Sequence, residues 1–165
     1  MPTKRLPRRF GRAVRGFVLL GPRDGALVAC AWTLLGISRL AILLLPFRLV
    51  RRALGERRDA GTPPAVAALD DATKVRAARI AAAVGLSARH TPWRSECYPQ
   101  ALTARLLLGM ARIPHVVSFG VRRDAGNLVA HAWVHAGDVP VTGGTGHSYT
   151  EVGSFAWTPR SRRDR

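Results

Sequence analysis

The chain has 165 residues, which is room for one domain or for one modest domain with a helical extension. Its hydrophobic content of 47% is that of a globular chain able to bury a core. Two cysteines, Cys30 and Cys97, are too few for a disulfide framework at this length. We therefore expect a reducing, cytoplasmic setting that leaves a thiol free for chemistry.

Positive charge dominates the composition: 26 Lys and Arg against 10 Asp and Glu give a net charge of +16. The cations cluster at the start, in the middle and at the end of the chain: Lys4, Arg5, Arg8, Arg9, Arg12 and Arg15; Arg48, Arg51, Arg52, Arg57 and Arg58; Arg160, Arg162, Arg163 and Arg165. Such clusters suit nucleic acid, anionic lipid or an acidic peptide, or simply cover a solvated surface. No zinc-finger spacing or aromatic ribonucleoprotein motif accompanies them, so specific nucleic-acid binding is not expected.

The first predicted element is an apolar helix over residues 24–45, ended by Pro46. Its uninterrupted apolar run, Gly25–Ser38, is about 14 residues long before Arg39, whereas a membrane span needs about 20. No small-residue cleavage site follows the run cleanly, which argues against a signal peptide. We expect a helix that is buried or that lies along a membrane surface.

Turn signals mark the boundaries of the next segments. A short basic helix or turn is predicted over residues 47–54, and Gly61–Pro64 is the clearest linker. These boundaries predict three parts: a basic arm with a helical region (1–60), a core (61–158) and a basic tail (159–165).

Two helices are predicted inside the core. Asp70 or Asp71 is placed to cap a helix that runs to about Val84, with Gly85 as its stop. A turn at residues 91–93 then leads into an apolar helix over Cys97–Met110.

Beyond Pro114 the apolar pattern has a period of two, which predicts strands. The predicted strands cover residues 116–122, Val129–Ala136 and Val139–Thr142, with a hairpin turn at 124–127 and a short final piece around 154–158. Helices followed by an antiparallel meander predict an α+β fold.

Cys97 is the candidate nucleophile. At the start of a helix, unpaired backbone amides and the helix dipole stabilise a thiolate, and one amide there can serve an oxyanion. A spacing of 100° per residue puts Cys97, Ala101, Ala104 and Leu108 on one stripe, whose alanines allow close approach to a sheet. The alternative is an inert buried cysteine.

His131 is the candidate base. It is predicted mid-strand, on one face with Trp133 and His135, where it can take a proton from a sulfur nucleophile. The alternative is a strand histidine satisfied by a neighbour. A cysteine at a helix start followed by a strand histidine is more specific than either residue alone.

The sequence does not decide which residue orients the His131 ring. Asp138 is closest in sequence but lies at a turn, Glu151 and His147 lie downstream, and Asp124 lies in the opposite turn. We take Asp138 as the first choice.

No metal or cofactor is predicted. His131 and His135 are spaced i,i+4, which on a strand separates them by about 13 Å, so a site shared with His147, Cys97 and Asp138 is not expected. His90 and His115 have no evident partner and are predicted to be surface residues.

Two motifs carry a resemblance to a known family. The stretch Thr91–Leu102 (TPWRSECYPQAL) is similar to the cysteine region of lasso-peptide leader peptidases. Gly120–Arg123 followed by Ala130–Val134 (AHAWV) resembles that family's histidine region at the expected separation. The segment Ser38–Arg48 is similar to its helical N-terminal part, and the likeness covers residues 35–150.

The resemblance implies a transglutaminase-like, papain-like fold in which the helix bearing Cys97 packs on a small antiparallel sheet. It implies a stand-alone cysteine endopeptidase with Cys97 as nucleophile and His131 as base. Its substrate would be a ribosomally made precursor peptide, its partner a small leader-recognition protein, and an asparagine-synthetase-like cyclase would close the macrolactam afterwards. The family's Asp about a dozen residues after the histidine falls on Gly143 here, so Asp138, a backbone carbonyl or another side chain orients His131.

Three other hypotheses remain at the level of sequence. The same thioester could be captured by an amine, which is acyl transfer. A non-catalytic, membrane-associated adaptor could use helix 24–45 and the basic arms. Nucleic-acid binding through charge alone predicts strong salt dependence without sequence preference.

Overall fold

The computed structural model describes residues 21–52, 54–58, 68–93 and 95–159. Its helices are α2 (Pro22–Leu44), α3 (Phe47–Arg52), α4 (Asp71–Arg89) and α5 (Cys97–Met110). Its strands are β1 (Glu56–Arg58), β2 (His115–Asp124), β3 (Asn127–Ala136), β4 (Val139–Thr142) and β5 (Thr150–Trp157). The predicted linker at Gly61–Pro64, the basic arm up to residue 20 and the tail beyond residue 159 lie outside the described residues.

The five strands form one sheet in the order β1-β5-β2-β3-β4, and every pairing is antiparallel. This confirms the α+β class but not the simple meander, because β5 returns to pair with β2. β1 was not predicted, since its three residues, Glu56–Arg58, carry no apolar alternation. It forms only because β5 offers it an edge.

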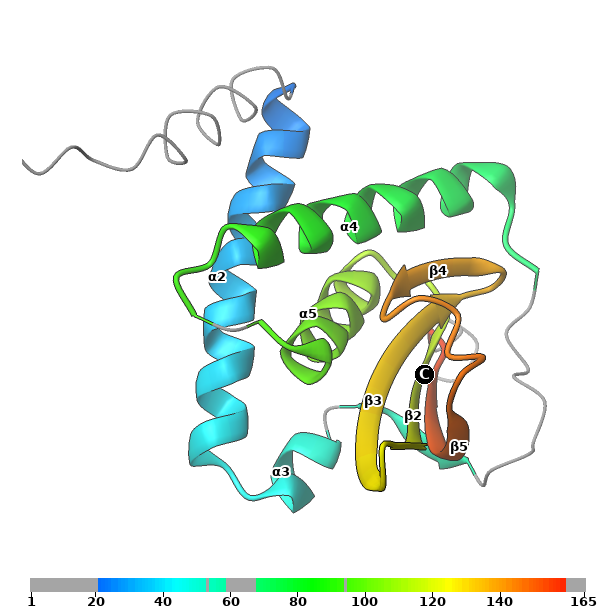
Figure 1. Cartoon of the computed structure of the whole chain (residues 1–165). Helices are drawn as coiled ribbons and strands as arrows, with labels where there is room; N and C mark the ends of the chain where they lie inside the picture. The colour runs from blue at the N-terminus through cyan, green and yellow to red at the C-terminus, as the bar shows by residue number, and fades with distance from the viewer. Residues whose placement is uncertain (1–20, 53, 59–67, 94, 160–165) are drawn as a thin grey trace, which may run out of the picture.

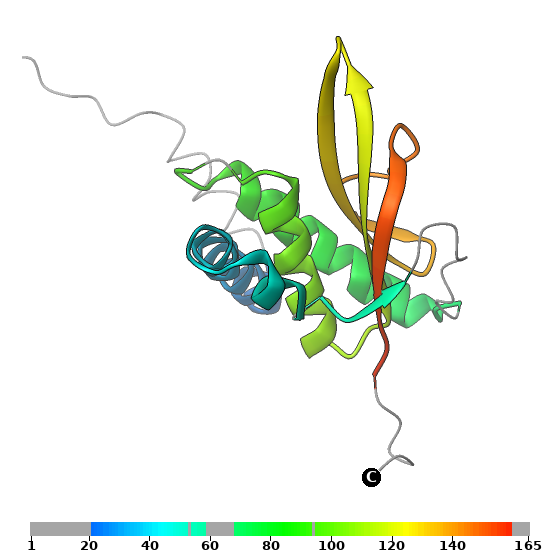
Figure 2. The same cartoon turned by 90° about the horizontal axis from the view of Figure 1, so that it is seen from below.

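Helices α2, α4 and α5 lie together on one side of the sheet (Figures 1 and 2). Ala101, Ala104 and Leu108 on α5 are fully buried, so the stripe predicted from their spacing is the face that packs. The alanines let α5 approach the sheet closely, and truncation of Leu108 to alanine is expected to destabilise the fold by about 2–5 kcal/mol.

Helix α4 begins as predicted and ends later. The Asp70 carboxylate accepts a hydrogen bond from the amide of Thr73 at 2.6 Å, which is an N-cap. The helix continues through Gly85 to Arg89 because its packing against α2 outweighs the penalty of about 1 kcal/mol for a helical glycine. Ser87, buried in this last turn, donates its hydroxyl to the carbonyl of Val28 at 3.0 Å.

The β2–β3 hairpin projects beyond the helices (Figure 2). Asp124 pairs with Asn127 across a two-residue turn in which Ala125 has φ 46° and Gly126 has φ 86°. Positive φ at both positions is the conformation that matches the twist of a tight hairpin. The register that follows, with Gly120 opposite His131, decides which face of the sheet each candidate residue occupies.

The prediction that His115 lies on the surface is wrong. His115 is fully buried: its ring stacks on Trp157 with centroids 5.3 Å apart, and Nδ1 donates to the carbonyl of Ile113 at 2.8 Å. Loss of hydration lowers the pKa of His115 from 6.5 to about 4, so the ring is neutral at neutral pH. His90 is exposed, as predicted.

Candidate active site

Cys97 is the first residue of α5, at the helix start that the sequence predicts. The preceding residue, Glu96, has an extended backbone, and its side chain makes no capping hydrogen bond. The first turn contains no acidic residue, and its unpaired backbone amides carry a partial positive charge at this end of the helix. Cys97 is half-buried and packs against the core.

Side chains within the preceding loop and the first turn of α5 hold this helix start in place. Thr91 Oγ1 donates to the carbonyl of Trp93 at 2.9 Å and lies 2.8 Å from Ser95 Oγ. From inside the helix, Gln100 Nε2 donates to the carbonyl of Ser95 at 2.6 Å. These contacts bridge the turn just before Cys97 and fix where α5 begins.

His131 lies on β3, and its Nε2 is 2.9 Å from the carbonyl oxygen of Gly143. A carbonyl only accepts hydrogen bonds, so Nε2 carries the proton in the neutral ring. The other nitrogen, Nδ1, is then the unprotonated one. A neutral imidazole with one nitrogen so anchored is prepared to take a proton at the other.

Aromatic rings fix the plane of this imidazole. Tyr149 stacks on His131 with ring centroids 4.6 Å apart, and Trp133 lies 6.1 Å away on the same strand face. The guanidinium of Arg122 lies over the Tyr149 ring at 5.0 Å. His131 is half-buried in this stack, so its contact with Gly143 is partly shielded from water.

Gly143 cannot carry a side chain in this backbone. Its φ is +74°, and an added Cβ would lie 2.5 Å from the carbonyl oxygen of Ala132 and 2.8 Å from Trp133 Cβ. An aspartate at this position is therefore excluded sterically. The backbone carbonyl, one of the alternatives left open by the sequence, contacts His131 instead.

Asp138 does not reach His131. Its carboxylate accepts a hydrogen bond from Lys74 Nζ at 2.8 Å, and this contact lowers the pKa of Asp138. The strand between His131 and Ala136 alone spans about 16 Å. Asp138 is two-thirds exposed and ties the β3–β4 turn to α4.

The remaining candidates are not brought to His131 either. Glu151 pairs with Gly120, so it stands on the same face as His131 but two strands away, about 10 Å. Burial lowers the pKa of His135, and His147 nearby lowers it further. Among the described residues no three His, Cys, Asp or Glu are grouped to hold a metal ion.

Comparison with protein families matches residues 41–154 to the transglutaminase-like superfamily. The chain belongs to this superfamily. Comparisons with curated proteins and with solved structures find no match. The predicted transglutaminase-like fold is thereby confirmed, with an N-terminal helix added to the α+β core.

Members of the superfamily are usually cysteine peptidases or transglutaminases, which share a thioester-forming cysteine. The matched segment starts inside α2, within the region predicted as an N-terminal extension, and contains Cys97, His131 and Gly143. The matched segment therefore includes both the helix start and the strand described above.

Cys97 and His131 are not in contact in this structure. Ala132, Val134 and Ala136 join the core on the α5 side of the sheet, so strand alternation turns His131 to the opposite face. In Figure 1, α5 lies to the left of β3, and the orange segment leading into β5 lies to the right. Within the described chain no hydrogen bond links Cys97 Sγ to His131.

Proposed function

We propose that this superfamily member is a cysteine endopeptidase that removes the leader from a ribosomally made lasso-peptide precursor before macrolactam closure. The observation that carries the proposal is the contact between His131 Nε2 and the Gly143 carbonyl. The Gly143 carbonyl oxygen stands where related peptidases are expected to place the carboxylate that orients the base. It leaves Nδ1 for the thiol of Cys97.

The likeness of Thr91–Leu102 and Ala130–Val134 to leader peptidases supports the choice of substrate. A small recognition protein is proposed as a partner that presents the leader, and the lasso cyclase as the enzyme that acts next. We propose a cytoplasmic setting because both Cys30 and Cys97 are free thiols.

In the proposed mechanism His131 Nδ1 takes the proton of the Cys97 thiol, and the thiolate attacks the scissile carbonyl carbon. The C–N bond breaks as the imidazolium returns its proton to the leaving amine, which becomes the amino terminus of the core peptide. Water then hydrolyses the thioester at Cys97. An amide at the start of α5 is placed to donate to the oxyanion.

This mechanism requires Cys97 Sγ and His131 Nδ1 to come together when the precursor binds. Catalytic hydrogen bonds often tighten only in the substrate complex. Within the described residues β4 pairs only with residues 134–136 of β3, and beyond that pairing Gly143 packs against Ala132 and Trp133. We propose that this edge of β3 rearranges as the precursor and the recognition protein dock, which brings His131 from the opposite face of the sheet toward Cys97.

Mass spectrometry of a candidate precursor tests the proposal. The precursor is incubated with the recognition protein and with wild type, Cys97→Ala or Cys30→Ala. Cys30 is exposed on α2 and serves as the matched control. We expect cleavage at one bond by wild type and Cys30→Ala, and none by Cys97→Ala.

Two outcomes would contradict the proposal. Equal cleavage by Cys97→Ala and wild type would remove Cys97 from the chemistry. A precursor that gains the mass of an added amine nucleophile, in place of water, would identify acyl transfer as the reaction.

A further inference from the structure

The outward face of α2 is apolar along its whole length. Helix α2 is the one described helix long and apolar enough to cross a membrane, with a hydropathy of 2.0, yet only 22% of its most apolar window is buried. Its inner face packs through Val28, Ala31 and Leu35. A long apolar helix that is covered on one side only leaves a hydrophobic surface for something else to cover.

The exposed residues form a continuous stripe. Ile37, Leu40 and Leu44 are 54%, 56% and 71% exposed. At 100° per residue they lie opposite the buried face, in line with the exposed residues Ala26, Ala29, Cys30 and Thr33 toward the start of the helix. From Ala26 to Leu44 this stripe is about 27 Å long.

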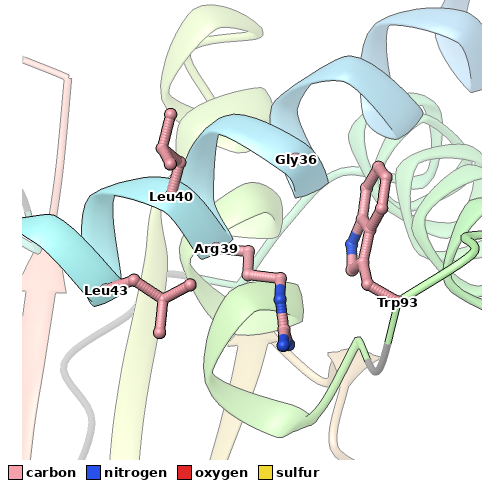
Figure 3. A pocket seen from close by; sticks show the side chains of 5 residues that line it. All are labelled: Gly36, Arg39, Leu40, Leu43 and Trp93. Carbon is pink, nitrogen blue, oxygen red and sulfur yellow. The ribbon is translucent and has the colours of Figure 1, made fainter.

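Further apolar and aromatic side chains flank the stripe. Leu43 is 68% exposed beside it, and Leu49 on α3 is 45% exposed. Figure 3 shows Leu43 and Arg39 of α2 beside Trp93, which lies in the loop before α5. Trp93 in turn contacts Trp32, itself 42% exposed, with ring centroids 5.3 Å apart.

The α2–α3 segment carries charge of one sign beyond its first turn. No Asp or Glu occurs between Gly25 and Gly55, whereas Arg39, Arg48, Arg51 and Arg52 do. The acidic residue of α2, Asp24, is paired with Arg79 at 3.0 Å. Apolar side chains bordered by arginines are complementary to a bilayer that carries anionic headgroups.

We propose that the outward face of α2, together with Leu49 of α3, docks on the surface of an anionic lipid bilayer. A second copy of this chain is a poorer occupant, because two chains of net charge +16 repel each other. The leucines enter the interfacial region, and Arg48, exposed on α3, faces the headgroups. The inference does not depend on the proposed peptidase function.

Co-sedimentation of the full chain with vesicles tests the proposal. Vesicles of phosphatidylcholine and phosphatidylglycerol (3:1) are compared with vesicles of phosphatidylcholine alone. We expect the wild type to partition at least tenfold more strongly to the anionic vesicles, and to lose much of that preference at high salt. Alkylation of Cys30, which is on the stripe, should slow when anionic vesicles are added.

Two double variants separate the apolar face from charge. Leu40→Glu with Leu44→Glu places two acids on the stripe. Leu128→Glu with Val152→Glu makes the same charge change at exposed positions on the sheet, 69% and 54% exposed. The first pair should lower partitioning at least tenfold, and the second less than threefold, with unchanged circular dichroism.

Three results would overturn the proposal. One is equal loss of partitioning in both double variants. The second is a wild type that does not sediment with vesicles while Cys30 alkylation stays unchanged. The third is a wild-type dimer that Leu40→Glu with Leu44→Glu converts to a monomer in light scattering, which would assign the face to a second copy.

Discussion

The carbonyl oxygen of Gly143 lies 2.9 Å from Nε2 of His131, where a carboxylate would stand in a cysteine-histidine-aspartate triad. A carbonyl fixes the tautomer and the orientation of the ring, as a carboxylate does. It adds no negative charge to stabilise the imidazolium that forms during catalysis. The orientation of the ring should therefore depend on the backbone of one glycine.

Gly143→Ala should lower kcat about a hundredfold, because the added Cβ would displace the carbonyl from the imidazole. Gly144→Ala is the matched control. Gly144 has a φ of +67°, so both variants carry backbone strain of about 1 kcal/mol, but an added Cβ there meets nothing within 4 Å. Single-turnover cleavage together with Tm separates the two effects. Equal activity of the two variants would remove the carbonyl from the mechanism.

His131→Ala should lower kcat by at least about a thousandfold, as expected for loss of a general base. His135→Ala removes a half-buried histidine from the same face of the same strand and should change kcat less than about threefold. Cleavage rates at saturating precursor measure both. If kcat fell strongly in His135→Ala while His131→Ala stayed active, His135 and not His131 would be the general base.

Asp138→Asn should leave cleavage unchanged, because Asp138 is bonded to Lys74 and not to His131. Lys74→Gln breaks the same exposed ion pair from the other side and should behave alike. If Asp138→Asn abolished cleavage while Lys74→Gln did not, Asp138 would be the orienting residue.

Buried His115 should make the fold acid-sensitive. The unfolded chain takes up a proton near pH 6.5, whereas the folded chain holds the ring neutral until about pH 4. Above pH 6.5 the protonation of His115 therefore costs the folded state no stability. As the pH falls from 6.5 to about 4, the free energy of unfolding drops by roughly 3 kcal/mol. Urea unfolding at pH 7 and at pH 4 should show this loss in wild type and in His90→Phe. The loss of stability should be smaller in His115→Phe. An equal loss in His115→Phe and wild type would show that His115 is not its source.

Much of the fold follows from local signals in the sequence. Asp70 as a cap, the start of α5 at Cys97 and the Asp124–Asn127 turn depend on neighbours a few residues away, so patterns reveal them. β1 and the place of β5 between β1 and β2 depend on pairing between distant segments. No local pattern carries that information.

The sequence singles out candidate residues for the site but not their contacts. Sequence singled out Cys97, His131 and the position of Gly143, yet not which atom of residue 143 touches the ring. That contact depends on a positive φ and on tight packing against Trp133. The burial of His115 likewise depends on Trp157, which lies more than forty residues away in sequence. The two residues are direct partners on the adjacent strands β2 and β5.

The most direct test of the account is whether Cys97 and His131 form a working pair. A short bifunctional alkylating agent, 1,3-dibromoacetone, reacts with a thiol and then with an imidazole within its reach. It is applied to the full chain with the precursor and the recognition protein bound, and the bridged peptides are located by mass spectrometry. We expect a bridge between Cys97 and His131 that appears with the partners and is absent from His131→Ala. If a preparation that cleaves the precursor before treatment gave Cys97 alkylated but never bridged to His131, the proposed pair would be contradicted.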